Sequence, residues 1–211
     1  MIFADRRDAG RQLAQALSTY KGRHPLILAI PRGAVPMGKT IADLLEGELD
    51  VVLVRKLTSP YSSEFALGAI DESGWAYIAD YAVSAGGTPE YMEREKQRQM
   101  VTLRERRAQY TPLHPPIDPA GRIVIIIDDG LATGSTMIAA LHATRAKNPA
   151  KLICAVPVSP PDTLEKVRPL CDELVCLHTP WDFRAVGQFY ADFNQVSDDE
   201  VVEILRQSPR S

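Results

Sequence analysis

The sequence predicts an α/β fold in which an open, mostly parallel sheet is covered by helices on both faces. Short, wholly apolar runs occur at 26–30, 51–54 and 123–127, and such runs are typical of strands buried on both faces. Patterns with helical spacing alternate with these runs. Strand, helix and strand follow one another within about 30 residues near the start of the chain, which is the length of a right-handed βαβ unit.

The individual elements follow in chain order. We expect a first helix over 5–20 with Asp5 as its cap, and a helix near 36–45 whose first turn tolerates Pro36. The strand at 51–54 is expected to end in Arg55 and Lys56. The alternation resumes at the strand 123–127, and the elements expected after it are a helix at 135–147, a strand at 152–156, a helix at 163–170 and a strand at 173–177.

Two segments interrupt the alternation. Between about 57 and 121 we expect an insertion, and its parts are a loop, a hairpin (65–70 and 75–79) and a charged helix (89–110). From about 178 to 211 an aromatic-rich tail forms a small hood, and its last helix begins at Ser197, which makes a capping box with Glu200. The 211 residues suit a single domain with these two additions.

Composition and charge exclude several classes of protein. Hydrophobic residues make up 45% and charged residues 24%, which are ordinary values for a globular chain. The formal net charge of −3 provides no basic field for a nucleic acid or an anionic membrane. Three cysteines are too few and odd in number for a disulfide framework, and no apolar run approaches the roughly 18 residues of a membrane span. We therefore expect a cytoplasmic protein with neither a membrane nor a nucleic-acid partner.

The first candidate phosphate-binding loop is Gly33 to Thr40, Gly-Ala-Val-Pro-Met-Gly-Lys-Thr. It matches the pattern G-x-x-x-x-G-K-T of nucleotide-hydrolysing P-loops, between a strand and a helix as that motif requires. Pro36, however, lacks the N–H that such a loop directs at the phosphates. We favour Pro36 as a first-turn residue of a helix, with Lys39 as a solvated side chain, and a P-loop hydrolase stays open as an alternative.

The second candidate is Asp128 to Thr136, Asp-Asp-Gly-Leu-Ala-Thr-Gly-Ser-Thr, directly after the strand 123–127. Two carboxylates leave the strand, and a loop of small and hydroxyl residues opens the next helix. A helix N-terminus binds phosphate through its free N–H groups, and paired aspartates suit sugar hydroxyls or a hard cation. Ligands of open α/β sheets bind at this carboxyl edge. The loop therefore indicates a site for a sugar phosphate.

This second loop carries a family resemblance. The run Val124 to Met137 closely resembles the phosphoribosyl-diphosphate-binding motif of type I phosphoribosyltransferases. Further segments resemble the family in the same order: 29–34 its diphosphate loop, 54–56 the basic end of its second strand, and 61–68 the mobile catalytic loop of its adenine-type enzymes. The whole chain most resembles a group of bacterial phosphoribosyltransferase-like proteins with no settled substrate.

The resemblance implies a Mg²⁺-dependent reaction of nucleotide salvage. A phosphoribosyl group passes from 5-phosphoribosyl 1-diphosphate to a nitrogen nucleophile, usually that of a nucleobase, and diphosphate is released. Asp128 and Asp129 would engage the ribose hydroxyls or water bound to the metal. The residues implied for the 5-phosphate are Ala132, Thr133, Gly134, Ser135 and Thr136, and those for the diphosphate are Arg32, Gly33, Arg55 and Lys56.

Other implied features concern the acceptor. Glu64, the only carboxylate between Thr58 and Ala69, would act as acid or base if its loop folds over the site, and a plain surface glutamate is the alternative. Aromatic hood residues would stack on a flat acceptor or form a small core: Trp181, Phe183, Phe189 and Tyr190. The strand 152–156 lacks the lysine that purine-salvage relatives often carry, which argues against a standard oxopurine. A non-catalytic, donor-binding regulator is the alternative on the same fold, and homodimers are common in the family.

Overall fold

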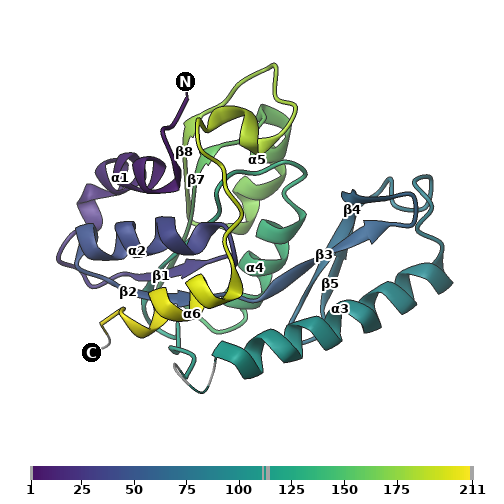
Figure 1. Cartoon of the computed structure of the whole chain (residues 1–211), viewed down its shortest axis with the longest axis horizontal. Coiled ribbons are helices and arrows are strands. Elements are labelled where there is room, and N and C mark those ends of the chain that lie inside the picture. Colours follow the sequence, from purple (N-terminus) through teal and green to yellow (C-terminus); the bar gives the residue numbers. More distant parts are fainter. Residues whose placement is uncertain (1, 111, 113–114, 210–211) are drawn as a thin grey trace.

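A parallel five-stranded sheet forms the centre of the chain (Figure 1). The computed structural model describes residues 2–110, 112 and 115–209, so part of the Pro-rich stretch 111–121, with which the predicted insertion ends, lies outside the described residues. The strand order is β2-β1-β6-β7-β8, and every neighbouring pair is parallel. The strands are β1 (Leu26–Ala29), β2 (Glu48–Val51), β6 (Ile123–Ile127), β7 (Lys151–Val158) and β8 (Glu173–His178).

Helices cover both faces of this sheet, as the sequence predicts (Figure 1). On one face, Ile27, Ile125 and Ile127 pack with α1, α2 and α6, and on the other, Leu28 and Ile126 pack with α4 and α5. The alternation follows from the two-residue period of a strand. The helices are α1 (Arg6–Ala16), α2 (Ala34–Leu45), α4 (Ser135–Arg145), α5 (Pro161–Val167) and α6 (Asp198–Arg206), with short 3₁₀ turns at Ser18–Tyr20, Arg168–Leu170 and Val186–Phe189.

The predicted caps are present at two helix starts. The Asp5 carboxylate accepts the N–H of Asp8 at 2.7 Å at the start of α1. The Ser197 hydroxyl accepts the N–H of Glu200 at 3.1 Å at the start of α6. Each cap satisfies a backbone donor that the first helical turn leaves without an intrahelical partner.

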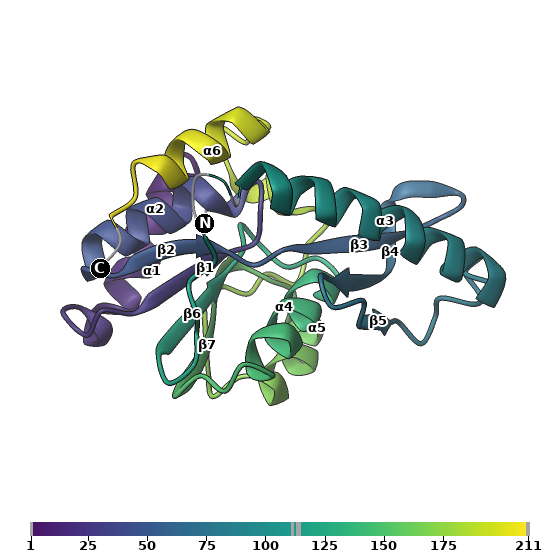
Figure 2. The ribbon, with the colours of Figure 1, turned by 90° about the horizontal axis from the view of Figure 1, so that it is seen from below.

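The inserted segment forms a second, antiparallel sheet of order β3-β4-β5, and the long helix α3 runs alongside it (Figure 2). Its elements are β3 (Val54–Ser59), β4 (Ser62–Asp71), β5 (Ala76–Ile78) and α3 (Pro89–Tyr110). The hairpin and the charged helix confirm the prediction. The prediction of a loop before Phe65 is wrong, because β3 extends to Ser59 and β4 already begins at Ser62, although the pairing of the two strands is irregular near this turn.

The strand expected at 51–54 is also misplaced. Strand β2 ends at Val51, and β3 begins at Val54 in the other sheet. Two charged residues, Glu48 and Asp50, are buried in β2, so its sequence does not show an apolar run. Glu48 pairs with Arg122 at 2.6 Å, and Asp50 accepts the N–H of Ile117 at 2.7 Å. Such partners allow charge in a buried strand, and they come from residues distant in sequence.

Two further predictions concern the whole chain. The three cysteines, at 154, 171 and 176, are free, as expected. No helix in the described part of the chain is long and apolar enough to cross a membrane.

Candidate functional site

The loop after β6 leads into the start of helix α4. Helix α4 begins at Ser135, and Gly134 before it has φ +80°, a conformation that favours glycine. A Cβ on Gly134 would lie 2.9 Å from Thr163 of α5. The Thr163 hydroxyl donates to the Ala132 carbonyl at 2.7 Å, and the Thr133 and Ser135 hydroxyls are hydrogen-bonded at 3.0 Å. The five predicted phosphate-binding residues, 132–136, thus form one compact turn at the positive end of a helix.

Asp128 and Asp129 lie between this turn and the end of β6, and both side chains are mostly buried. The Asp128 carboxylate accepts the N–H of Asp129 at 2.9 Å. Burial, together with the neighbouring charge of Asp129, raises the pKa of Asp128 well above its usual value. Burial also raises the pKa of Asp129, although the Arg6 guanidinium opposes this rise. Two adjacent carboxyls can hydrogen-bond to hydroxyl groups, and a bound cation would favour their ionised form.

Arg6 is a site residue that the sequence did not reveal. Its Nε donates to Asp129 Oδ2 at 3.0 Å, its Nη1 donates to the Asn194 carbonyl at 2.7 Å, and its guanidinium lies 4.0 Å from the centre of the Phe193 ring. Arg6 therefore ties helix α1, the aspartate pair and the tail together. A single arginine, 123 positions from its partner, offers no pattern by which it could be found.

The diphosphate loop predicted at 29–34 lies against the aspartates. Strands β1 and β6 are neighbours, with Ala29 opposite Ile127, so their carboxyl ends meet at one edge. The peptide bond between Pro31 and Arg32 is cis. A Cβ on Gly33 would clash with Asp129 Oδ2, so only glycine permits this approach.

Arg55 and Lys56 do not act as a pair at the end of a parallel strand, contrary to the sequence interpretation. Both lie in β3 of the antiparallel sheet, where successive side chains point to opposite faces. The positive charge of Lys56 lowers the pKa of both Asp128 and Asp129. Arg55 lies against α3, where its Nε donates to Gln99 Oε1 at 2.9 Å.

Glu64 is not brought to the aspartates. It is the third residue of β4, at the hairpin end of the strand, and it is exposed. This end of the hairpin projects away from the five-stranded sheet (Figures 1 and 2). The segment 61–68, expected as a mobile loop, lies largely in β4, where Ser62, Ala66 and Gly68 pair with β3 across two irregularities in the register.

The aromatic residues of the tail have different surroundings. Phe189 and Tyr190 are buried, and Phe183 packs against Phe189 with ring centres 5.6 Å apart. The Tyr190 hydroxyl donates to the Asp129 carbonyl at 2.6 Å, and burial raises the pKa of Tyr190. Trp181, by contrast, is 90% exposed. Three of the four hood residues therefore pack as a small core that supports the aspartates, and only Trp181 is open to a ligand.

The alternative P-loop is packed as an ordinary helix. Pro36 lies within the first turn of α2, and the Lys39 ammonium pairs with the Asp43 carboxylate at 2.6 Å on the same helix. A Cβ on Gly38 would lie 2.7 Å from Leu49, so this glycine serves the close packing of α2 on the sheet. None of these features directs a group at a phosphate.

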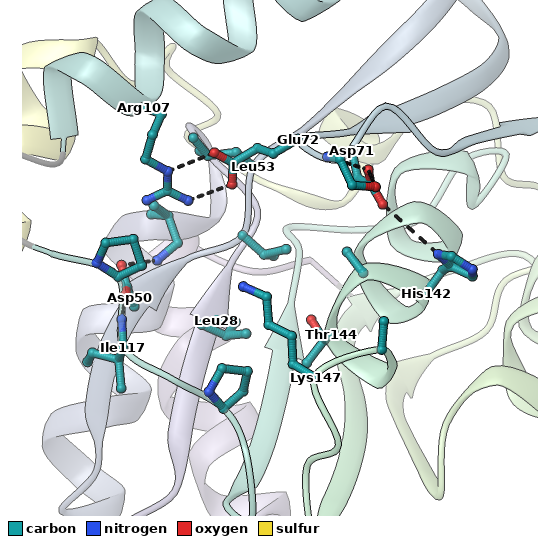
Figure 3. A pocket seen from close by; sticks show the side chains of 17 residues that line it. Leu28, Asp50, Leu53, Asp71, Glu72, Arg107, Ile117, His142, Thr144 and Lys147 are labelled. Carbon is teal, nitrogen blue, oxygen red and sulfur yellow. Dashed lines mark hydrogen bonds and ion pairs between the residues drawn. The ribbon is translucent and has the colours of Figure 1, made fainter.

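A cavity of about 230 Å³ lies elsewhere, between strand β2, the end of α4 and the end of α3 (Figure 3). Its charged side chains are largely engaged with one another or with the backbone. Arg107 binds Glu72 through two hydrogen bonds, of 2.8 and 2.6 Å, and the Asp71 carboxylate lies 4.0 Å from His142 Nδ1. It holds none of the residues predicted to bind phosphate, so we place the candidate site at the strand ends.

The described residues contain no group of three or more acidic, histidine or cysteine side chains placed to hold a metal ion. The site is thus an α/β sheet edge with a turn at the start of a helix, an aspartate pair and a second loop that approaches it. These features are typical of domains suited to a phosphorylated sugar.

Comparisons with known proteins agree with this class. The model of the family described as "Phosphoribosyl transferase domain" matches residues 4–194, so the chain belongs to this family. The chain is 42% identical over 212 residues to "Putative phosphoribosyl transferase Rv0571c" of Mycobacterium tuberculosis (strain ATCC 25618 / H37Rv). That match covers 99% of this chain and 47% of the relative, so the chain spans about half the length of the curated relatives it matches.

A solved structure is similar over the whole chain. The crystal structure of TT1426 from Thermus thermophilus is 42% identical, with a TM-score of 0.81, over 98% of this chain and 99% of that one. The fold, including the inserted hairpin and long helix, is therefore shared by a protein of similar length.

Proposed function

We propose that this chain transfers a phosphoribosyl group from 5-phosphoribosyl 1-diphosphate to a nitrogen nucleophile and releases diphosphate. The observation that carries the proposal is the position of the turn 132–136, the aspartate pair and the loop 31–33 along one sheet edge. A donor with a phosphate at one end, a ribose in the middle and a diphosphate at the other end fits this order of groups.

The turn at 132–136 is suited to the 5-phosphate. The first-turn N–H groups of α4 have no intrahelical acceptors, and the helix dipole favours a dianion. The hydroxyls of Thr133 and Ser135 add neutral donors beside them. Binding energy from this remote phosphate helps to hold the reacting carbon in place, which lowers the barrier to transfer.

The aspartate pair is suited to the ribose. Carboxylates that accept hydrogen bonds from the ribose hydroxyls orient the ring and place negative charge near the cationic ribose that develops as the C1–oxygen bond breaks. Arg6 and Tyr190 hold Asp129 from the side chain and the backbone, so its orientation is set before the donor binds. Lys56 and the arginine of the diphosphate loop supply positive charge for the leaving group.

The residues of this site can supply part of the coordination shell of a magnesium ion. Asp128 and Asp129 provide oxygen ligands, and Mg²⁺ usually keeps several waters and binds through one or two carboxylates together with substrate phosphates. Two carboxylates rather than a full protein cage are therefore sufficient. When bound, the ion neutralises charge on the diphosphate as it leaves.

The acceptor is expected to be a small nitrogenous ring, a nucleobase by analogy with the family. We assign the stacking role to Trp181, because it is exposed while the other three hood aromatics are packed.

The test is diphosphate release. The chain is given donor, Mg²⁺ and a panel of purine, pyrimidine and other nitrogenous acceptors, and free diphosphate is measured by a coupled phosphate assay. We expect release with at least one acceptor and a large loss with the Asp128→Asn variant. Tight donor binding by calorimetry with no release for any acceptor would overturn the catalytic proposal and identify a donor-binding regulator.

A further inference from the structure

The cavity of about 230 Å³ beside strand β2 is lined by segments that are far apart in the sequence (Figure 3). The inserted segment contributes the end of β4 and Arg107 of α3, while the end of β2 and residues 142–147 belong to the five-stranded sheet and the end of α4. Leu28, Leu53 and Ile117 provide apolar walls. The volume is below the range of about 300–1,000 Å³ that is typical of ligand pockets, so an occupant is small.

The acidic side chains of this cavity have partners within the protein. The two Glu72 oxygens accept hydrogen bonds from Arg107, at 2.8 and 2.6 Å. Asp71 Oδ1 accepts three hydrogen bonds from the turn that follows it. The Asp50 carboxylate accepts two backbone N–H groups, at 2.8 and 2.7 Å. The acceptors of the cavity are therefore already engaged.

Three donors of the cavity, by contrast, have no acceptor among the described residues. Arg107 binds Glu72 through Nε and Nη2, so Nη1 points away from Glu72, and this atom is buried without a hydrogen-bond partner in the described part of the chain. Thr144 is buried, and its hydroxyl makes no hydrogen bond to any residue described. The Lys147 side chain runs into the cavity and forms no ion pair with a described residue (Figure 3). Buried donors without acceptors are unfavourable, so an occupant that presents acceptors is favoured.

The charges around the cavity favour an uncharged occupant. The carboxylates at positions 50, 71 and 72 outnumber the charged groups of Arg107 and Lys147. His142, whose Nδ1 lies 4.0 Å from Asp71, would only balance this count if it were protonated. An added anion would therefore gain no net attraction from its surroundings. A neutral oxygen acceptor can use the same donors without repulsion from the acids.

We propose that this cavity binds an uncharged ring of nucleobase size through carbonyl oxygens on the ring. Arg107 lines the cavity from α3, and Thr144 and Lys147 line it from the end of α4, so a ring with two carbonyls presents an acceptor to each side. The apolar walls suit the body of the ring, and a rigid ring loses little conformational freedom on binding.

This site is separate from the proposed donor site. The turn 132–136 lies at the start of α4, and the helix then runs for 11 residues, roughly 16 Å, before it reaches the cavity. The inference therefore concerns a second ligand site, and it does not rest on the proposed function. Because Arg107 belongs to the inserted segment and Lys147 does not, an occupant would join the insertion to the rest of the domain.

The test is a titration of the full chain with uracil, an uncharged ring that carries two carbonyl oxygens, followed by ¹H–¹⁵N NMR. We expect uracil to shift the backbone signals of Ile117 and Thr144. Thr144→Val removes the hydroxyl at nearly constant volume, and Lys147→Met removes the ammonium; each should weaken uracil binding at least fivefold. Lys166→Met, a matched control at an exposed position of α5 outside the cavity, should leave it within twofold.

A third variant addresses the buried guanidinium. Arg107→Lys keeps a positive charge for Glu72 and removes Nη1, so it should also weaken uracil binding at least fivefold. The variants of Thr144 and Lys147 decide the matter if Arg107→Lys does not fold.

Four results would overturn the inference. The first is the absence of any shift at the cavity signals, and the second is a shift that Thr144→Val and Lys147→Met both retain. The third is a response of these signals to benzoate, a charged ring of similar size, and not to uracil. The fourth is a set of shifts confined to the tail around Trp181, which would assign uracil to the proposed acceptor site. None of these results depends on donor binding or diphosphate release, so the failure of this inference is distinguishable from failure of the proposed function.

Discussion

Replacing Arg6 by methionine should destabilise the fold, because it leaves the buried carboxylate of Asp129 without its positive partner. The Arg6–Asp129 pair joins residues far apart in sequence, and the two side chains are only 12% and 16% exposed. Removing one partner of a fully buried pair costs about 3–5 kcal/mol, because the remaining charge is left in a poor solvent. The remaining exposure reduces this, so we expect about 2–3 kcal/mol at pH 7.

The pH dependence of this loss follows from the pKa of Asp129. Burial already raises that pKa, and removal of Arg6 raises it further. An acid whose pKa is higher in the folded than in the unfolded state favours the fold when protonated, and this contribution is lost as the pH rises through the folded value. The difference between wild type and Arg6→Met should therefore shrink toward acidic pH.

Urea denaturation followed by circular dichroism measures these effects. The free energy of unfolding is compared for wild type, Arg6→Met, Asp129→Asn and the double variant, with Arg7→Met as the exposed control on the same helix turn. The double variant should be more stable than the sum of the single losses predicts, by about 2 kcal/mol. Additive losses, or an Arg6→Met variant as stable as Arg7→Met, would refute the reasoning.

Three other substitutions test the site. Asp128→Asn should raise the free energy of unfolding at pH 7 by about 1–2 kcal/mol, because it removes a charge that burial and Asp129 disfavour. This gain in stability should fade as the pH is lowered, and urea midpoints at two pH values measure it. Gly33→Ala should cost about 1–3 kcal/mol and weaken donor binding by calorimetry, since its Cβ would clash with the Asp129 carboxylate. Lys39→Ala should lose only the helical pair with Asp43, about 0.3–0.5 kcal/mol, and leave donor binding unchanged; loss of ATP binding in this variant would instead favour the P-loop alternative.

The sequence predicted best those elements whose signals are local. The strand at 123–127 and the helix at 89–110 have the predicted bounds, and the caps Asp5 and Ser197 are where their patterns place them. An apolar run, a helical period and a capping side chain all act within a few residues of one another. Local sequence is therefore enough to determine them.

Predictions failed where a residue depends on a partner distant in the chain. Strand β2 can be buried with two charged residues because Arg122 forms an ion pair with Glu48 and the N–H of Ile117 donates a hydrogen bond to Asp50. Arg55 and Lys56 lie outside the central sheet because β3 pairs with β4, and their side chains point to opposite faces because successive residues of a strand alternate. The residues of a single strand do not determine which strand it will pair with when either of two sheets could include that strand.

By itself the sequence determined the order of strands and helices, the turn that opens α4 and the aspartates before it, because these follow from spacing along the chain. Only the tertiary structure decided that Arg6 holds Asp129 and that Glu64 lies away from the acids. The physical reason is that electrostatic partners are chosen by distance in space, and the packing of α1, α3 and the second sheet sets those distances.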